Sequence, residues 1–338
     1  MIVLGIESSC DETAAALVKD GNVILSSVVA SQTDIHHQYG GVVPEIASRM
    51  HIEAIVPVID KALTRAELSI NDIDGVAATR GPGLIGALLI GFSFAKAFAY
   101  ARHIKFAGVN HLEGHIYSSF LSDPTLKFPF ICLVASGGHT NIYYVDSLDS
   151  FELMGQTRDD AVGEAFDKVS KMIGLGYPGG AVIEKLAKKG NPDKIKFPRT
   201  YLEKESFDFS FSGIKSSVLR YITEHKENID SKKADIAAGF QAAVIDVLKT
   251  KLIKASLIKN CKNIAITGGV SANQTFFKLL LKDAAQHGIK VFAPKKELCG
   301  DNAAMIAARG YRLLCNKDYT EFDHDVFSKN KINSAGIK

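Results

Sequence analysis

Residues 2–18 read IVLGIESSCDETAAALV, and this stretch decides the fold. An apolar run over 2–6 meets a polar turn at 7–13, and a second apolar run follows over 14–18. The turn Asp20-Gly21-Asn22 then leads into a third run, 23–29. Short apolar runs separated by turn residues are typical of β-strands in hairpins. The chain is therefore predicted to open with three strands of one sheet.

The same order returns in the second half of the chain. An apolar run over 130–135 enters the turn Ser136-Gly137-Gly138-His139-Thr140, and strand-like runs follow over 141–145 and 151–154. Each half continues with helices, a strand, a glycine loop and a further helix. Such a duplication predicts two related α/β domains that face a cleft, with ligands beyond the strand ends.

The remaining elements follow from periodicity and turn residues. In the first half we expect helices over 44–68 and 84–100, strands over 76–78 and 106–109, and a helix from His111. In the second half we expect helices over 161–173, 183–189, 214–225, 233–259 and 274–287, strands over 263–266 and 291–293, and a last helix near Asp301.

The predicted domain boundaries follow the duplication. The first domain spans 1–128 and is completed by the C-terminal helix, about 295–325, which we expect to pack back on it. The second domain spans 129–294, and 326–338 is a polar tail.

Composition indicates an ordinary soluble protein. The 338 residues are 46% hydrophobic and 23% charged, with a net charge of +3 that permits a polyanionic partner without requiring one. Five scattered cysteines without a Cys-x-x-Cys pair favour a reducing compartment over a disulfide framework. Since the N-terminus lacks a basic region, it is no signal peptide, and the apolar stretch 84–100 is better read as a buried helix than as a membrane span. We therefore expect a cytoplasmic protein.

Two histidines four residues apart, His111 and His115, would project from one face of a helix and could reach one ion. Glu113 lies between them and points away, which is not the spacing of a His-Glu-x-x-His metalloprotease. Asp301, at a loop-to-helix junction, is a possible third ligand or a helix cap. Two histidines and one carboxylate would leave open coordination positions, which suits catalysis. The alternative is that both histidines are packing or surface residues.

Glycine loops mark a second candidate site. Ser136-Gly137-Gly138 would let backbone N–H groups approach a phosphate, or is simply a tight turn. Thr267-Gly268-Gly269 lies between a strand and a helix whose N-terminus favours an anion. Asn273 would cap that helix or bind a ribose or base. The glycine-dense loop 174–180 suits close approach to a nucleobase or ribose, and Glu184 could accept a ribose hydroxyl.

Acidic and basic clusters complete the candidates. Glu7, Asp11 and Glu12 place three carboxylates in one turn, which either needs a cation or proton partner or is a solvated acidic turn. Asp167 would share a helix face with Glu164, facing the cleft or solvent. Six basic residues between 185 and 199 are usually a solvated face, with nucleic-acid contact as the alternative.

Several motifs together resemble the TsaD family, and they span nearly the whole chain in order. They are Glu7-Ser8-Ser9-Cys10-Asp11-Glu12-Thr13, Thr79-Arg80-Gly81-Pro82-Gly83, Asn110-His111-Leu112-Glu113-Gly114-His115, Ser136-Gly137-Gly138-His139-Thr140, Gly176-Tyr177-Pro178-Gly179-Gly180, Phe209-Ser210-Phe211-Ser212-Gly213-Ile214-Lys215, Gly268-Gly269-Val270-Ser271-Ala272-Asn273 and Gly300-Asp301-Asn302. The resemblance is to the bacterial form, without a fused kinase.

The resemblance implies the actin-like fold of sugar kinases and heat-shock chaperone ATPases. It implies transfer of a threonylcarbamoyl group from threonylcarbamoyl-adenylate to N6 of the adenosine beside the anticodon in tRNAs reading ANN codons. It also implies two protein partners, a smaller TsaB-type paralogue and a TsaE-type ATPase.

The site residues that the resemblance implies fall into three groups. A divalent metal, iron or zinc, would be held by His111, His115 and Asp301. The adenylate, an ATP- or AMP-type ligand, would be held by Val134, Ala135, Ser136, Gly137, Gly138, Asp167, Gly180, Glu184 and Asn273. Asp11 and Glu12 would be catalytic. Archaeal relatives place a metal-contacting Tyr where this chain has Val134, so substrate oxygens or water would complete the metal shell.

Three rival functions remain at this point. A non-catalytic nucleotide-binding scaffold would leave the set of His111, His115 and Asp301 unexplained. A small-molecule kinase fits the same fold but would need an acid placed for a substrate hydroxyl. A metal-dependent glycoprotein endopeptidase would need a general base beside the metal, and Glu113 is expected on the wrong face for that.

Overall fold

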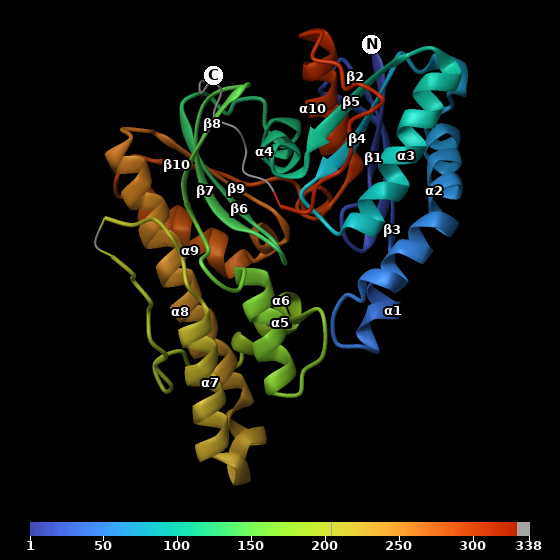
Figure 1. Cartoon of the computed structure of the whole chain (residues 1–338). Coiled ribbons are helices and arrows are strands. Elements are labelled where there is room, and N and C mark those ends of the chain that lie inside the picture. Colours follow the sequence, from blue (N-terminus) through green and yellow to red (C-terminus); the bar gives the residue numbers. More distant parts are fainter. Residues whose placement is uncertain (204, 330–338) are drawn as a thin grey trace. The chain divides into compact units, whose positions relative to one another are not determined.

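A computed structural model describes residues 1–203 and 205–329 of the chain, and residues 330–338 of the predicted polar tail lie outside this range. The chain divides into two compact units (Figure 1). Unit 1 consists of Met1–Thr125 together with the segment that starts at Pro294, and unit 2 is Leu126–Ala293.

Unit 1 is built on a five-stranded sheet in the order β3-β2-β1-β4-β5. The strands are β1 (Ile2–Glu7), β2 (Glu12–Lys19), β3 (Val23–Ser31), β4 (Gly75–Gly81) and β5 (Lys105–Asn110). The first three are antiparallel neighbours, whereas β4 pairs in parallel with both β1 and β5.

Both faces of this sheet are buried, because successive side chains of a strand point to opposite faces. On β2, Ala15 and Leu17 join a core with α2 (Pro44–Ala66) and α3 (Ile85–Arg102). Ala14, Ala16 and Val18 join a second core with α10 (Ala303–Cys315). Close packing of α10 on β1 requires a glycine, since a Cβ at Gly5 would lie 2.2 Å from the Ala303 carbonyl oxygen.

The remaining helices of unit 1 are α1 (Thr33–His37) and α4 (His111–Ser122), with short 3₁₀ turns at Ile70–Asp72 and Lys296–Leu298. α4 packs against α10. The helix from His111 was predicted, but α1 was not. It has only five residues, too few to show a helical period.

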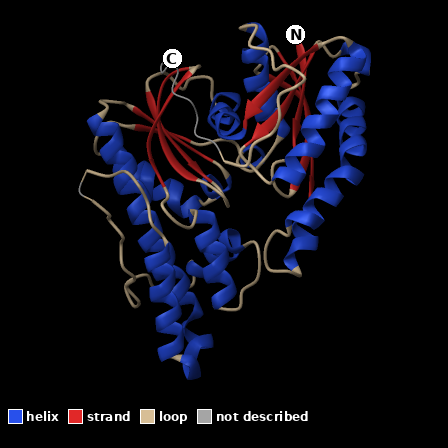
Figure 2. Ribbon diagram, viewed as in Figure 1, coloured by secondary structure: helices blue, strands red, loops and turns tan. Residues whose placement is uncertain are grey.

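Unit 2 repeats the plan with a second sheet, whose strands are red in Figure 2. The strand order is β10-β9-β6-β7-β8. Its strands are β6 (Phe130–Ala135), β7 (Thr140–Ser147), β8 (Ser150–Gln156), β9 (Asn263–Thr267) and β10 (Lys290–Phe292). Three antiparallel strands are again followed by two parallel ones. The duplication read from the sequence is therefore confirmed at the level of sheet topology.

The helices of unit 2 are α5 (Val162–Met172), α6 (Gly179–Ala187), α7 (Ser212–Glu224), α8 (Ile229–Ile258) and α9 (Gln274–Ala285), with 3₁₀ turns at Lys226–Asn228 and Gly269–Ala272. α6 begins four residues before the predicted start at residue 183, so that prediction was wrong. Two glycines are weak helix formers, but the Gly179 N–H donates to the Asp167 carboxylate at 2.7 Å, which caps the helix from outside.

Helix α3 is the one helix of the described residues that is long and apolar enough to cross a membrane, with one third of that stretch buried. Its Leu88, Phe92 and Ala95 are buried in the core against the sheet of unit 1. It is therefore a core helix, as predicted.

Candidate metal centre and nucleotide loops

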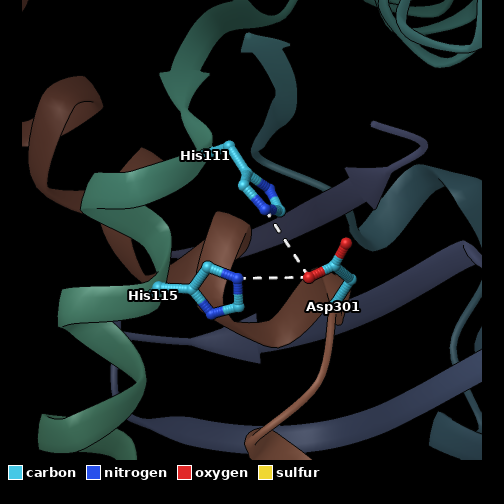
Figure 3. A group of neighbouring side chains, drawn as sticks. All are labelled: His111, His115 and Asp301. Carbon is cyan, nitrogen blue, oxygen red and sulfur yellow. Dashed lines mark hydrogen bonds and ion pairs between the residues drawn. The ribbon is translucent and has the colours of Figure 1, made fainter. Parts of the chain in front are cut away.

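His111 and His115 stand one turn apart at the start of α4, and Asn110 caps that helix by accepting from the Leu112 N–H at 2.9 Å. Their ring centroids are 4.6 Å apart. Asp301 approaches both rings from the loop before α10 (Figure 3). Its Oδ1 lies 3.1 Å from His115 Nε2 and 3.5 Å from His111 Nε2. The cap of α10 is Asn302, so Asp301 points at the histidines instead of capping the helix.

These three residues fit a metal ion. Their ligand atoms all lie within 4.8 Å of one another. Bonds of about 2.1 Å in a tetrahedral site place neighbouring ligand atoms roughly 3.4 Å apart, close to the separations observed. Imidazole nitrogen and carboxylate oxygen are the donors that zinc and iron share. His115 is fully buried and His111 is 4% exposed, so both rings are held by packing.

Charge in this region also favours a cation. Burial opposes protonation of His111, but the charges of Asp301 and Glu7 outweigh it and raise its pKa to about 9. Burial dominates at His115 and lowers its pKa. Burial, Asp11 and Asp301 together raise the pKa of Glu12 well above its ordinary value. Several acids thus crowd one region of unit 1, and a divalent cation would relieve their repulsion.

The acidic turn is not a solvated surface feature. Glu7 is fully buried and Asp11 is 8% exposed. Glu7 has a partner that sequence reasoning missed, since its Oε2 lies 3.1 Å from Nδ1 of His111. The signal in the sequence was an acid at the end of an otherwise apolar strand, but nothing local identified the partner 104 positions away.

Glu113 lies away from the metal ligands, as predicted. Its carboxylate accepts from Arg309 Nε at 2.6 Å. Since the described residues give Glu113 this structural ion pair, it is not available as the base that an endopeptidase would need beside the metal.

In unit 2, the Ser136 loop is a tight turn between β6 and β7. The Ser136 N–H donates to the His139 carbonyl at 2.9 Å, and the Ser136 carbonyl accepts from the Gly163 N–H at 3.2 Å. Val134 and Ala135 lie in β6 with buried side chains, so only their backbone could meet a ligand.

Several glycines of the described chain occupy positions where neither packing nor backbone conformation requires a glycine. At these positions no atom beyond the chain neighbours and, for a helical glycine, the backbone of its own helix comes within 4 Å of a Cβ, and the backbone does not adopt a positive φ. They are Gly137, Gly138, Gly180, Gly269 and Gly300. Each lies in a loop, or in the first turn of a helix, that holds or adjoins a predicted site residue. An open position without backbone strain is what close approach of a ligand would require.

Other loop glycines are explained by packing. A Cβ at Gly163 would lie 2.6 Å from the Ser136 carbonyl oxygen, and one at Gly179 would lie 2.5 Å from the Phe166 carbonyl oxygen. Gly268 has φ +84° and faces the Ala135 carbonyl. Close packing or a positive φ thus explains these three glycines, whereas neither explains the open ones.

Polar side chains around α9 have structural partners in unit 2. Asn273 caps α9 by accepting from the Phe276 N–H at 2.9 Å, and its amide donates to Gln241 at 3.0 Å. The cap interpretation is therefore confirmed. Glu184 accepts from the Gln274 N–H at 3.1 Å, which brings its carboxylate to the same helix end. Asp167 holds the start of α6, as described above.

Residues 209–213, with the sequence FSFSG, stabilise the turn before α5. The sequence alone did not reveal this role. The hydroxyls of Ser210 and Ser212 and the Phe211 N–H all donate to the Asp159 carboxylate. This turn leads into the helix that carries Gly163 and Asp167.

The basic segment 185–199 is partly neutralised. Lys188, Lys194 and Arg199 form ion pairs with Glu184, Asp235 and Asp246, respectively. Lys185, Lys189 and Lys196 are exposed. Nucleic-acid contact by this segment stays a prediction.

The chain is similar to known proteins along most of its length. Residues 23–308 match the family described as "TsaD: tRNA N6-adenosine threonylcarbamoyltransferase". A tRNA N6-adenosine threonylcarbamoyltransferase from Desulforapulum autotrophicum is 62% identical over 98% of this chain and 100% of that protein. One from Caldicellulosiruptor saccharolyticus is 54% identical over 93% of each chain.

Solved structures share the fold at low sequence identity. Component A of the (R)-2-hydroxyglutaryl-CoA dehydratase of Acidaminococcus fermentans has a TM-score of 0.56 at 15% identity and covers 93% of this chain and 99% of its own. Full-length HypF has a TM-score of 0.59 at 15% identity over 94% of this chain and 46% of its own. These neighbours have the actin-like ATPase fold, which agrees with the two duplicated sheets.

Proposed function

The chain belongs to the TsaD family and transfers a threonylcarbamoyl group to N6 of adenosine in tRNA, and we propose that its donor is threonylcarbamoyl-adenylate, held by the glycine loops of unit 2. The open glycines carry this proposal, because neither packing nor backbone conformation explains them. Backbone N–H groups around Ser136 and the N-terminus of α9 would bind the phosphate of the adenylate. The Glu184 carboxylate would accept a hydrogen bond from a ribose hydroxyl.

In unit 1, the proposed metal ligands are His111, His115 and Asp301, and the ion is iron or zinc. A bound divalent ion would supply Lewis-acid stabilisation of charge on a carbamoyl or phosphoryl oxygen of the donor. Elemental analysis of the purified chain tests this site. We expect about one equivalent of metal in the wild type and almost none in His115→Ala. Equal metal content in both would contradict the assignment.

We propose that Asp11 and Glu12 position the N6 amine and accept its proton. The amine is a weak nucleophile, and a carboxylate whose pKa is raised, as at Glu12, is better matched to proton transfer near neutral pH. Asp11→Ala should lose transfer activity while keeping its metal content and thermal midpoint. Full activity of Asp11→Ala and of Glu12→Ala would remove both residues from the mechanism.

We propose that α2 and α3 form a docking face for a TsaB-type paralogue. Ile52, Val56, Ile85 and Leu89 are between 39% and 60% exposed on these two neighbouring helices of unit 1, and a group of exposed apolar side chains on adjacent helices suits a protein partner. Leu89→Glu should abolish co-elution with the paralogue. Leu257→Glu, at an exposed leucine of α8 in unit 2, is the matched control and should co-elute normally. Co-elution of both variants with the paralogue would mean that the interface lies elsewhere on the chain.

A TsaE-type ATPase is proposed as the second partner on the family resemblance alone. We also propose a cytoplasmic location. The described cysteines are all free, which suits a reducing compartment.

A further inference from the structure

Glu7 is a buried carboxylate that the proposed mechanism does not use. It ends β1, and its side chain is fully buried. Three groups surround it. Thr79 donates its hydroxyl to Oε2 at 2.6 Å, the Ser9 N–H donates to Oε1 at 2.5 Å, and Nδ1 of His111 lies 3.1 Å from Oε2.

The contact with His111 determines which ring nitrogen carries the hydrogen. A carboxylate can only accept, and Glu7 already accepts from the Thr79 hydroxyl and the Ser9 N–H. Nδ1 of His111 must therefore be the donor. Nε2, on the other side of the ring, is the atom 3.5 Å from Asp301.

We propose that Glu7 is a positioning residue that orients the His111 ring and directs the lone pair of Nε2 toward the metal. The proposal rests on the metal site proposed above. Metal-binding histidines commonly donate their second ring N–H to a carboxylate, which fixes both tautomer and orientation. Two further contacts make Glu7 suited to this role, because Thr79 and the Ser9 backbone hold the carboxylate in place before any ion arrives.

The same residue joins the metal ligand to the acidic turn. Glu7 ends the strand that leads into the turn carrying Asp11, and the hydroxyl of Ser9, in that turn, lies 3.3 Å from Nδ1 of His111. Glu7 thus sets the position of a metal ligand relative to that turn, within one unit of the fold.

The test is metal affinity, measured by competition between the full-length chain and a chelator for Zn²⁺. Glu7→Gln keeps the shape but removes the charge, and we expect about 10- to 100-fold weaker binding. Glu7→Asp keeps the charge but shortens the side chain, so it should weaken binding as well. Asp60→Asn, which neutralises an exposed carboxylate of α2, is the control and should bind as the wild type does.

Each outcome is decisive. Wild-type zinc affinity in Glu7→Gln would overturn the proposal. Wild-type zinc affinity in Glu7→Asp would mean that Glu7 acts only through its charge and does not position the His111 ring. Absence of zinc binding by the wild-type chain would instead overturn the metal site on which it rests.

A second measurement does not depend on how any variant folds. In the zinc-loaded wild type with ¹⁵N-labelled histidine, NMR should show His111 with hydrogen on Nδ1 and metal on Nε2. The opposite tautomer would refute the role of Glu7.

Discussion

Gly180→Ala tests whether the open glycines of unit 2 are kept for a ligand. Gly180 is the second residue of α6, and apart from its chain neighbours and the backbone of its own helix, no described atom lies within 4 Å of the position of a new methyl group. Alanine is the better helix former by about 0.5–1 kcal/mol. The variant should therefore be as stable as the wild type, or more stable by up to about that amount.

Nucleotide binding should respond in the opposite direction. If the adenylate approaches as closely as glycine permits, one added methyl group overpacks the contact at a cost of about 1–3 kcal/mol. Each 1.4 kcal/mol is a factor of ten, so the affinity for AMP should fall roughly 5- to 150-fold. Titration calorimetry with AMP measures the affinity, and a thermal melt measures the stability.

Gly213→Ala provides the matched control. Gly213 is also the second residue of its helix, α7, and a Cβ there would meet only Thr200 Oγ1 at an ordinary 3.5 Å. This variant should gain stability without losing AMP affinity. Unchanged AMP affinity in a folded Gly180→Ala protein would refute the argument that its open position is reserved for a ligand.

Three further predictions follow from unit-specific contacts. Because the pKa of His111 is about 9, a metal ion must displace a proton from this ring. Metal affinity should therefore rise roughly tenfold per pH unit between about pH 6 and about pH 8. A metal affinity that does not change with pH, measured by chelator competition, would contradict this. Burial lowers the pKa of His51, whose Nε2–H donates to the Cys10 carbonyl, so below about pH 6.5 the unfolded chain binds a proton that the folded chain resists. The free energy of unfolding should therefore decrease as the pH is lowered below about 6.5, and it should decrease less steeply in His51→Gln. If denaturant titrations gave parallel pH curves for the two proteins, His51 would be excluded as the cause. Gly163→Ala places a methyl group 2.6 Å from the Ser136 carbonyl and should cost about 1–3 kcal/mol of stability by urea unfolding, whereas a neutral result would mean that the loop shifts freely.

The sheets could be predicted because their strands carry their own signals. The short apolar runs and the polar turns between them are local patterns, and the two halves repeat them. Helix α6 was placed too late because its cap, Asp167, belongs to another helix. No local rule identifies a cap supplied from twelve residues away.

The candidate site divides in the same way. The spacing of His111 and His115 could be read directly, since both lie on one helix face. The pairing of Glu7 with His111 could not, because it depends on β1 and α4 meeting in the folded unit. The ion pair of Glu113 with Arg309 was equally hidden, although the direction of Glu113 followed from the helical period.

The most direct test of the central claim is nucleoside mass analysis of unmodified ANN-decoding tRNA after incubation with this chain, its partners and a threonylcarbamoyl-adenylate source. We predict a threonylcarbamoyladenosine peak with the wild type and none with His111→Ala, at a temperature at which both proteins are folded. A peak of equal size with His111→Ala would contradict the account, because transfer would then proceed without the proposed metal centre.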